Sequence, residues 1–172
     1  EGLNLRGVAV HIGSQLQSLD PLEKCYARIG ELVEQLRAAG HIISHVDLGG
    51  GLGVPYKPED NPPSPAEYGA MVARVTRHWD VTLMFEPGRV IAGNSGIMIT
   101  RVIRIKPGVD SDFVIVDAAM NDLMRPAIYD AWHDFAAVEP CGETMVASIV
   151  GPICESSDIF AKERTVDRVE TG

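Results

Sequence analysis

The first half of the chain alternates short apolar runs with amphipathic stretches. The apolar runs have the length of strands and lie at residues 5–10, 42–48 and 81–85. Between them, apolar residues recur at helical spacing over residues 21–40 and 65–79. This order of strand, helix, strand, helix and strand predicts a parallel sheet with helices packed outside it.

Both predicted helices begin with a capping signal. Asp20-Pro21-Leu22-Glu23 has an acid at the expected N-cap, proline at the first helical position and glutamate at the third. Ser64-Pro65-Ala66-Glu67 repeats this arrangement. The helices are therefore expected to begin at Pro21 and Pro65.

Glycine-rich or polar segments follow each of the three predicted strands. They are His-Ile-Gly-Ser-Gln at 11–15, Gly-Gly-Gly-Leu-Gly at 49–53 and Glu-Pro-Gly-Arg at 86–89. In parallel α/β folds the carboxyl ends of the strands share one edge of the sheet, where sites are built. We therefore expect the three segments to share one pocket, and the long proline-rich loop at 55–65 to be functional.

Helical periodicity fades beyond about Gly96. Strand-like runs occupy residues 97–105, 113–116 and 145–150, which predicts antiparallel β structure. The expected domains are thus a partial α/β domain at 1–96 and a partial β domain at 97–172. Because the chain starts at a glutamate and enters a strand without a signal peptide, we expect a segment of a longer protein.

Composition narrows the classes of partner. The 172 residues are 45% apolar and 23% charged, as in globular proteins, and none of the apolar runs approaches the ~20 residues of a membrane helix. A net charge of −9 with dispersed Lys and Arg disfavours nucleic acid. Cys25, Cys141 and Cys154 are widely spaced, and His41 and His45 lack a third ligand, so we expect a cytoplasmic protein without disulfides or a metal.

The glycine loop at 49–53 suits an anion better than a nucleotide. Val54 stands where a dinucleotide fingerprint needs its third glycine, and the chain has no nucleotide-binding lysine motif. Consecutive glycines allow backbone N–H groups to approach an anion, although a merely flexible turn is the alternative. Glu86 follows an apolar run, so we expect partial burial and a cationic partner, unless it forms an ordinary surface pair with Arg89. His11 alone is compatible with a structural or a catalytic role.

Five motifs, in this order, resemble the diaminopimelate decarboxylase branch of the alanine-racemase-like pyridoxal-phosphate enzymes. They are the three segments above, Met-Arg-Pro-x-x-Tyr at 124–129 and Cys-Glu-Ser-x-Asp at 154–158. The resemblance extends over residues 7–158. It implies the C-terminal part of a (β/α)8 barrel followed by part of an antiparallel β domain. It also implies a homodimer with shared active sites and the decarboxylation of meso-diaminopimelate to L-lysine.

The resemblance further implies a role for each motif residue. The cofactor, pyridoxal 5′-phosphate, would contact His11, Ser14, Gly49, Gly50, Gly51, Glu86, Pro87, Gly88 and Arg89. The substrate would contact Arg89, Arg125, Tyr129 and Glu155. The expected catalytic residues are His11 against the cofactor ring, Glu86 at the ring nitrogen and Cys154 as the proton donor, with Cys154 and Glu155 reaching the site of the partner subunit. Acidic neighbours disfavour a thiolate at Cys154, which suits a thiol that donates a proton.

One essential residue of that family is not expected in this segment. The Schiff-base lysine lies upstream, and Lys24, Lys57, Lys106 and Lys162 match none of the motif positions, so the segment alone should be inactive. A related decarboxylase of ornithine, arginine or carboxynorspermidine stays open, although its cationic substrate would be repelled by Arg125. A catalytically dead relative that binds another protein is the second alternative, and the lysine of the full-length chain decides it.

Overall fold

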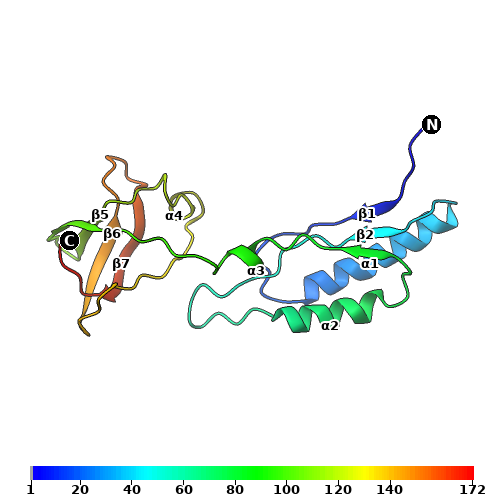
Figure 1. Ribbon diagram of the computed structural model, residues 1–172, viewed down its shortest axis with the longest axis horizontal. Helices are drawn as coiled ribbons and strands as arrows, with labels where there is room; N and C mark the ends of the chain where they lie inside the picture. The colour runs from blue at the N-terminus through cyan, green and yellow to red at the C-terminus, as the bar shows by residue number, and fades with distance from the viewer. Residues whose placement is uncertain (1) are drawn as a thin grey trace. The chain divides into compact units, whose positions relative to one another are not determined.

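The computed structural model describes residues 2–172, which divide into two compact units (Figure 1). The first unit ends at Ile97 and the second begins at Met98. Each unit has its own sheet and its own hydrophobic core, so each is described by itself. None of the helices among the described residues is long and apolar enough to span a membrane.

The first unit contains a three-stranded parallel sheet. Its strands, β1 (Gly7–Ala9), β2 (His45–Asp47) and β3 (Thr82–Met84), lie side by side in that order (Figure 1). Val8 pairs with Val46 in the register, and Val46 pairs with Leu83. The predicted parallel sheet is confirmed, with each strand shorter than its apolar run.

Two long helices cover one face of this sheet: α1 (Asp20–Ala38) and α2 (Pro65–Thr76) (Figure 1). The predicted capping box of α2 is confirmed. The Glu67 N–H donates to Ser64 Oγ over 3.2 Å, and the Ser64 N–H donates to Glu67 Oε2 over 2.8 Å. The expected N-cap of α1 is wrong by one residue: Leu19 occupies that position, and the Asp20 N–H donates to Ser18 Oγ.

The core of the first unit lies between the helices and the sheet. Its most deeply buried side chains are Leu22, Tyr26, Val33, Val46 and Leu48. The Tyr26 hydroxyl donates to the Leu48 carbonyl over 3.1 Å and lies 3.0 Å from the Tyr68 hydroxyl, and burial raises the pKa of Tyr26. This contact joins α1, α2 and the end of β2 directly beneath the glycine loop.

The face of the sheet that the helices do not cover is exposed to solvent. Successive strand residues point to opposite faces, so Ala9 and Met84 lie on the face away from the helices. Ala9, Thr82 and Met84 are all exposed, Met84 by 49%. The helix-covered sheet of this unit therefore has one solvent-exposed face.

The second unit contains a mixed four-stranded sheet. Its strands, β4 (Val102–Lys106), β5 (Asp112–Val116), β6 (Thr144–Val150) and β7 (Ile159–Asp167), lie in that order. The outer pairs are antiparallel, but β5 and β6 are parallel. The expectation of an antiparallel domain is therefore wrong for the central pair. The long connection between β5 and β6 permits this crossover, since parallel neighbours need a dozen or more connecting residues.

Two short elements complete the fold. In the first unit, α3 (Arg89–Ala92) follows β3 in the chain. In the second unit, α4 (Arg125–Tyr129) belongs to the connection from β5 to β6 and contacts β7. Neither helix is long enough to show helical periodicity in the sequence. Strand β7 was also not predicted, because register shifts and a positive φ of 46° at Glu163 interrupt its alternation.

Candidate functional site

The loops that follow β1, β2 and β3 are joined by backbone hydrogen bonds. The Glu86 N–H donates to the Gly49 carbonyl over 2.8 Å, and the Leu16 N–H donates to the Gly51 carbonyl over 2.9 Å. The Gly50 N–H also lies 3.5 Å from His11 Nδ1. Three segments that are far apart in the sequence therefore meet at one edge of the sheet.

Glycine is required at three consecutive positions of this junction. φ is +66° at Gly49 and +106° at Gly51, a region that favours glycine. A Cβ at Gly49, Gly50 or Gly51 would overlap the carbonyl oxygen of Val10, Glu86 or Gly13, respectively. The loop is thus a packed element rather than a flexible turn. Its changing sign of φ suits the convergence of backbone N–H groups on an anion.

Two polar side chains that the sequence interpretation left unassigned stabilise the junction. Gln15 Nε2 donates to the Val54 carbonyl over 2.6 Å, and Gln15 Oε1 accepts from the Val54 N–H over 3.1 Å. Asp47 Oδ1 accepts from the Gly49 N–H over 2.8 Å. A carboxylate at the end of an otherwise apolar strand was the available signal for Asp47, because a polar group there needs a partner.

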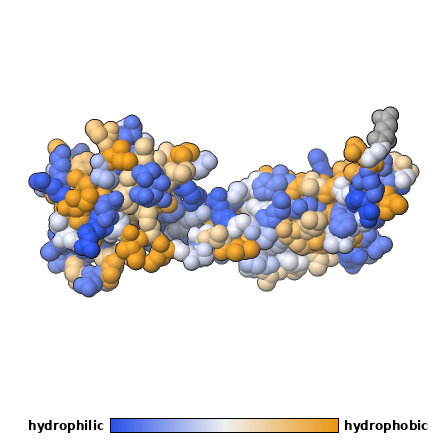
Figure 2. All heavy atoms as spheres, turned by 45° about the horizontal axis from the view of Figure 1, so that its top comes forward, coloured by the Kyte–Doolittle hydropathy of each residue, from blue (hydrophilic) through white to orange (hydrophobic). Residues whose placement is uncertain are grey.

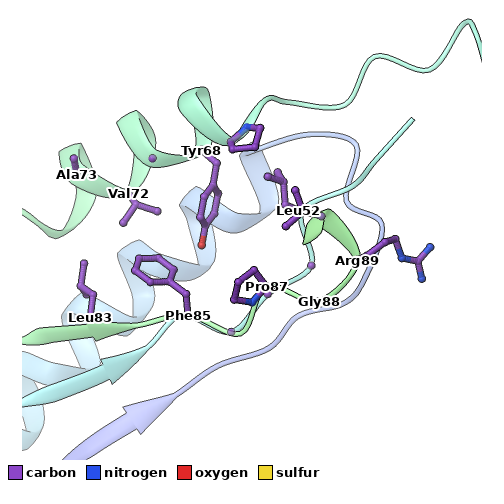
Figure 3. A pocket seen from close by; sticks show the side chains of 15 residues that line it. Leu52, Tyr68, Val72, Ala73, Leu83, Phe85, Pro87, Gly88 and Arg89 are labelled. Carbon is purple, nitrogen blue, oxygen red and sulfur yellow. The ribbon is translucent and has the colours of Figure 1, made fainter. Parts of the chain in front are cut away.

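A cavity of about 530 Å³ lies beside the glycine loop, between α2 and β3 (Figure 3). Tyr68, Val72 and Phe85 form part of its apolar wall, and residues 49–51 and 87–89 form the opposite end. The Arg89 side chain extends away from the apolar wall (Figure 3). His11, Ser14 and Glu86 are not among the lining residues. The glycine loop and residues 87–89 therefore line the cavity, at the end opposite its apolar wall.

Arg89 is oriented by the proline-rich loop. Its Nη1 donates to the Tyr56 hydroxyl over 3.2 Å, and its guanidinium lies 5.8 Å from the Tyr56 ring centroid. Asp60 accepts from the N–H groups of Tyr56 and Lys57, over 2.8 and 3.0 Å, and these bonds lower the pKa of Asp60. Tyr56 was not predicted as a site residue, since its contact with Arg89 joins positions 33 residues apart.

Glu86 is exposed, so the expectation of its partial burial is wrong. Its position explains the difference, because Glu86 continues the alternation of Thr82 and Met84, which are exposed on the face away from the helices. His11 and Ser14 are exposed as well. These three side chains, which are expected around the cofactor, are therefore accessible in this unit.

The second unit carries the other candidate residues on two loops. One follows β5 and leads into α4, where Arg125 and Tyr129 are four residues apart and hence on one helical face. The other follows β6 and carries Cys154 and Glu155, both of which are exposed. Because β5 and β6 are parallel neighbours, both loops begin at the same edge of the sheet.

Arg125 has a partner that was missed in the sequence. Its Nη1 lies 3.3 Å from His133 Nε2. Burial and the positive charge of Arg125 lower the pKa of His133, so the neutral ring is favoured. Arg164 fixes this segment to β7 by donating to the His133 carbonyl over 2.6 Å and stacking 3.3 Å from the Trp132 ring centroid.

The family follows from comparison with known sequences. The family model described as "Pyridoxal-dependent decarboxylase, C-terminal sheet domain" matches residues 16–172. The chain belongs to the pyridoxal-dependent decarboxylases. A curated member of the family, the diaminopimelate decarboxylase of Zymomonas mobilis subsp. mobilis, is 50% identical over 169 residues, which are 98% of this chain and 40% of that protein.

Solved structures of the family have the same fold. Diaminopimelate decarboxylase from M. jannaschii in complex with L-lysine has a TM-score of 0.95 and 36% identity, over 100% of this chain and 41% of that one. Lysine/ornithine decarboxylase from Vibrio vulnificus in complex with cadaverine has a TM-score of 0.87 over 98% of this chain and 46% of that one. At 21% identity this second likeness concerns the fold alone. The chain thus spans about two-fifths of the curated relative's length.

Proposed function

We propose that this chain is part of a meso-diaminopimelate decarboxylase, a carboxy-lyase that uses pyridoxal 5′-phosphate and forms L-lysine and carbon dioxide. The observation that carries the proposal is the junction of three strand-end loops, in which glycines 49–51 have no space for a side chain. Relatives at 37–50% identity bear the name of this enzyme, which supports the substrate.

The residues at the junction fit the cofactor. Its dianionic phosphate needs N–H donors and a cation, which the Gly51 N–H, Ser14, Gly88 and Arg89 would supply, since the N–H groups of Gly49 and Gly50 already donate to Asp47 and His11. A Cβ at Gly88 would meet open space, so an approaching group has room there. His11, Glu86 and Pro87 would contact the ring. Backbone donors explain how a chain of charge −9 binds an anion.

Each catalytic side chain has a definite task. Pyridoxal phosphate, when bound, supplies an electron sink for the bond that breaks as carbon dioxide leaves. The Glu86 carboxylate would lie at the ring nitrogen, where its negative charge would favour the protonated form of that nitrogen. Cys154 Sγ donates a proton to the carbon that has lost carbon dioxide, and the thiolate then takes a proton from solvent. The exposure of Cys154 in this chain leaves its thiol accessible to a substrate.

The substrate assignment rests on charge. Arg125 and the Tyr129 hydroxyl would hold the distal carboxylate of meso-diaminopimelate, Glu155 its ammonium group, and Arg89 would contribute a further cation. Hydrogen bonds from Ser156 and Ser157 lower the pKa of Glu155, which keeps the carboxylate ionised for this task. Ornithine and arginine carry a distal cation that Arg125 would repel.

The architecture of the full-length protein is part of the proposal. We infer that residues 1–96 form the last strands and helices of a (β/α)8 barrel and that residues 97–172 begin the β domain. The parallel sheet with helices on one face supports this, as do the exposed Met84 and Phe85, which further barrel elements would cover. Figure 2 shows hydrophobic surface on both units. A homodimer with shared active sites and a cytoplasmic location complete the proposal.

The substitution Arg125→Ala in the full-length protein tests the substrate. The kcat/KM for meso-diaminopimelate should fall by an amount worth roughly 2–5 kcal/mol, because the distal carboxylate loses its charged partner. Activity on ornithine, if measurable, should stay constant or rise. Arg104→Ala, an exposed arginine on β4, is the matched control and should change neither. An equal loss of kcat/KM for both substrates would refute the charge argument. If the full-length chain lacked the Schiff-base lysine, a catalytically inactive binding protein would be favoured instead.

A further inference from the structure

Asp158 is a buried carboxylate that contacts two loops at once. Its residue is only 2% exposed. Its Oδ1 accepts from the Met120 N–H over 2.7 Å, and its Oδ2 accepts from the Ile153 N–H over 2.7 Å. Met120 lies in the turn after β5, and Ile153 lies in the loop after β6. Each carboxylate oxygen is thus bound to a different loop.

The loop at 151–158 is closed tightly around this carboxylate. The Gly151 N–H donates to the Asp158 carbonyl over 3.0 Å, and the Asp158 N–H donates to the Glu155 carbonyl over 3.0 Å. A Cβ at Gly151 would overlap both carboxylate oxygens. Glycine at 151 and aspartate at 158 are therefore required together, since one provides the space that the other fills.

The two loops joined by Asp158 carry the candidate site residues of the second unit. The turn with Met120 leads directly into α4 and Arg125, while Cys154 and Glu155 lie within the loop at 151–158. A second contact, 3.3 Å from Ser157 Oγ to Met120 Sδ, joins the same loops. Hydrogen bonds to an ionised acceptor are about twice as strong as neutral ones, so the carboxylate dominates this junction.

We propose that Asp158 is a positioning residue that holds the Arg125 segment and the Cys154 segment in one fixed arrangement. The inference rests on the proposed function for the roles of Arg125 and Cys154. Asparagine at 158 has one oxygen and one NH2 group, so it can accept from one loop only and places a donor against the other N–H. Substitution by asparagine therefore frees one loop while changing the size of the side chain little.

Asp158→Asn in the full-length holoenzyme tests the proposal. We expect kcat/KM for meso-diaminopimelate, per cofactor-loaded protomer, to fall about 100-fold, as for a displacement of reacting groups by about 1 Å. Amide hydrogen exchange should accelerate in the Met120 turn or the Ile153 loop. Asp117→Asn is the matched control, because Asp117 directly follows β5 and also accepts a backbone N–H, that of Arg101, but is exposed. It should alter kcat/KM less than about threefold.

A second variant keeps the test decisive if Asp158→Asn fails to fold. Gly151→Ala should lower kcat/KM and accelerate hydrogen exchange in the same way as Asp158→Asn. In an Asp158→Ala background the same substitution should have smaller effects on both, because no carboxylate is left for the new Cβ to overlap. Unchanged kcat, KM and exchange in Asp158→Asn, with only a lower melting temperature, would overturn the proposal. If the wild-type holoenzyme does not decarboxylate diaminopimelate, the proposed function fails. Hydrogen exchange alone then decides whether Asp158 holds the two loops.

Discussion

Gly50→Ala in the full-length protein should separate the backbones that form the cofactor-binding junction. The new Cβ would overlap the Glu86 carbonyl, while φ at this position is not positive, so backbone conformation adds no strain. The loop must move by about 1 Å, and such a displacement costs about 100-fold in rate. The 2.8 Å bond from the Glu86 N–H to the Gly49 carbonyl spans the same gap and would be stretched or broken.

Gly69→Ala is a matched control for this substitution. Gly69 also lines the cavity, but it lies within α2, and a Cβ there would meet no atom within 4 Å. That change should stabilise the protein by about 0.5–1 kcal/mol and leave activity unaltered. Carbon dioxide release, cofactor absorbance and the melting temperature measure the activity, cofactor binding and stability of both variants. For Gly50→Ala we expect the free energy of unfolding to fall by about 1–3 kcal/mol. Equal activity and cofactor binding in the two variants would refute the proposed packing of the junction.

Three further predictions concern single features. Glu86→Gln should lower turnover of the full-length enzyme by about 10² at saturating cofactor, because the charge at the ring nitrogen is lost, and a change of a few-fold only would exclude this role. The pKa of His133 is lowered in the folded protein, so its contribution to the free energy of unfolding is constant above the unfolded value near 6.5 and decreases as the pH falls below it. The melting temperature should therefore fall less between pH 7 and pH 5 in His133→Gln than in the wild type, and identical pH profiles would contradict the assignment. The purified 172-residue chain should release no carbon dioxide from meso-diaminopimelate, and ordinary enzymatic rates would disprove the need for the missing lysine.

Local signals predicted much of the first unit. The capping box at Ser64 and Glu67 identified the start of α2, because both of its hydrogen bonds join residues three positions apart. Alternating strands and helices indicated the parallel sheet, since each element lies beside its neighbour in the chain. The glycines at 49–51 indicated close backbone approach, and all three do exclude a side chain.

The features that were missed depend on contacts between distant residues. The parallel pairing of β5 with β6 depends on a crossover that their apolar patterns do not encode. Tyr56 beside Arg89, and His133 beside Arg125, become recognisable only after the chain has folded. The exposure of Glu86 followed from strand alternation, which was outweighed in the prediction by the apolar residues before it.

The most direct test of the account is the reaction of the full-length protein, reconstituted with pyridoxal phosphate, on meso-diaminopimelate. We predict that carbon dioxide and L-lysine form in equal amounts, and that ornithine and arginine supplied at the same concentration yield little or none. Release of carbon dioxide chiefly from ornithine or arginine, or no lysine from diaminopimelate with the cofactor bound, would contradict the account.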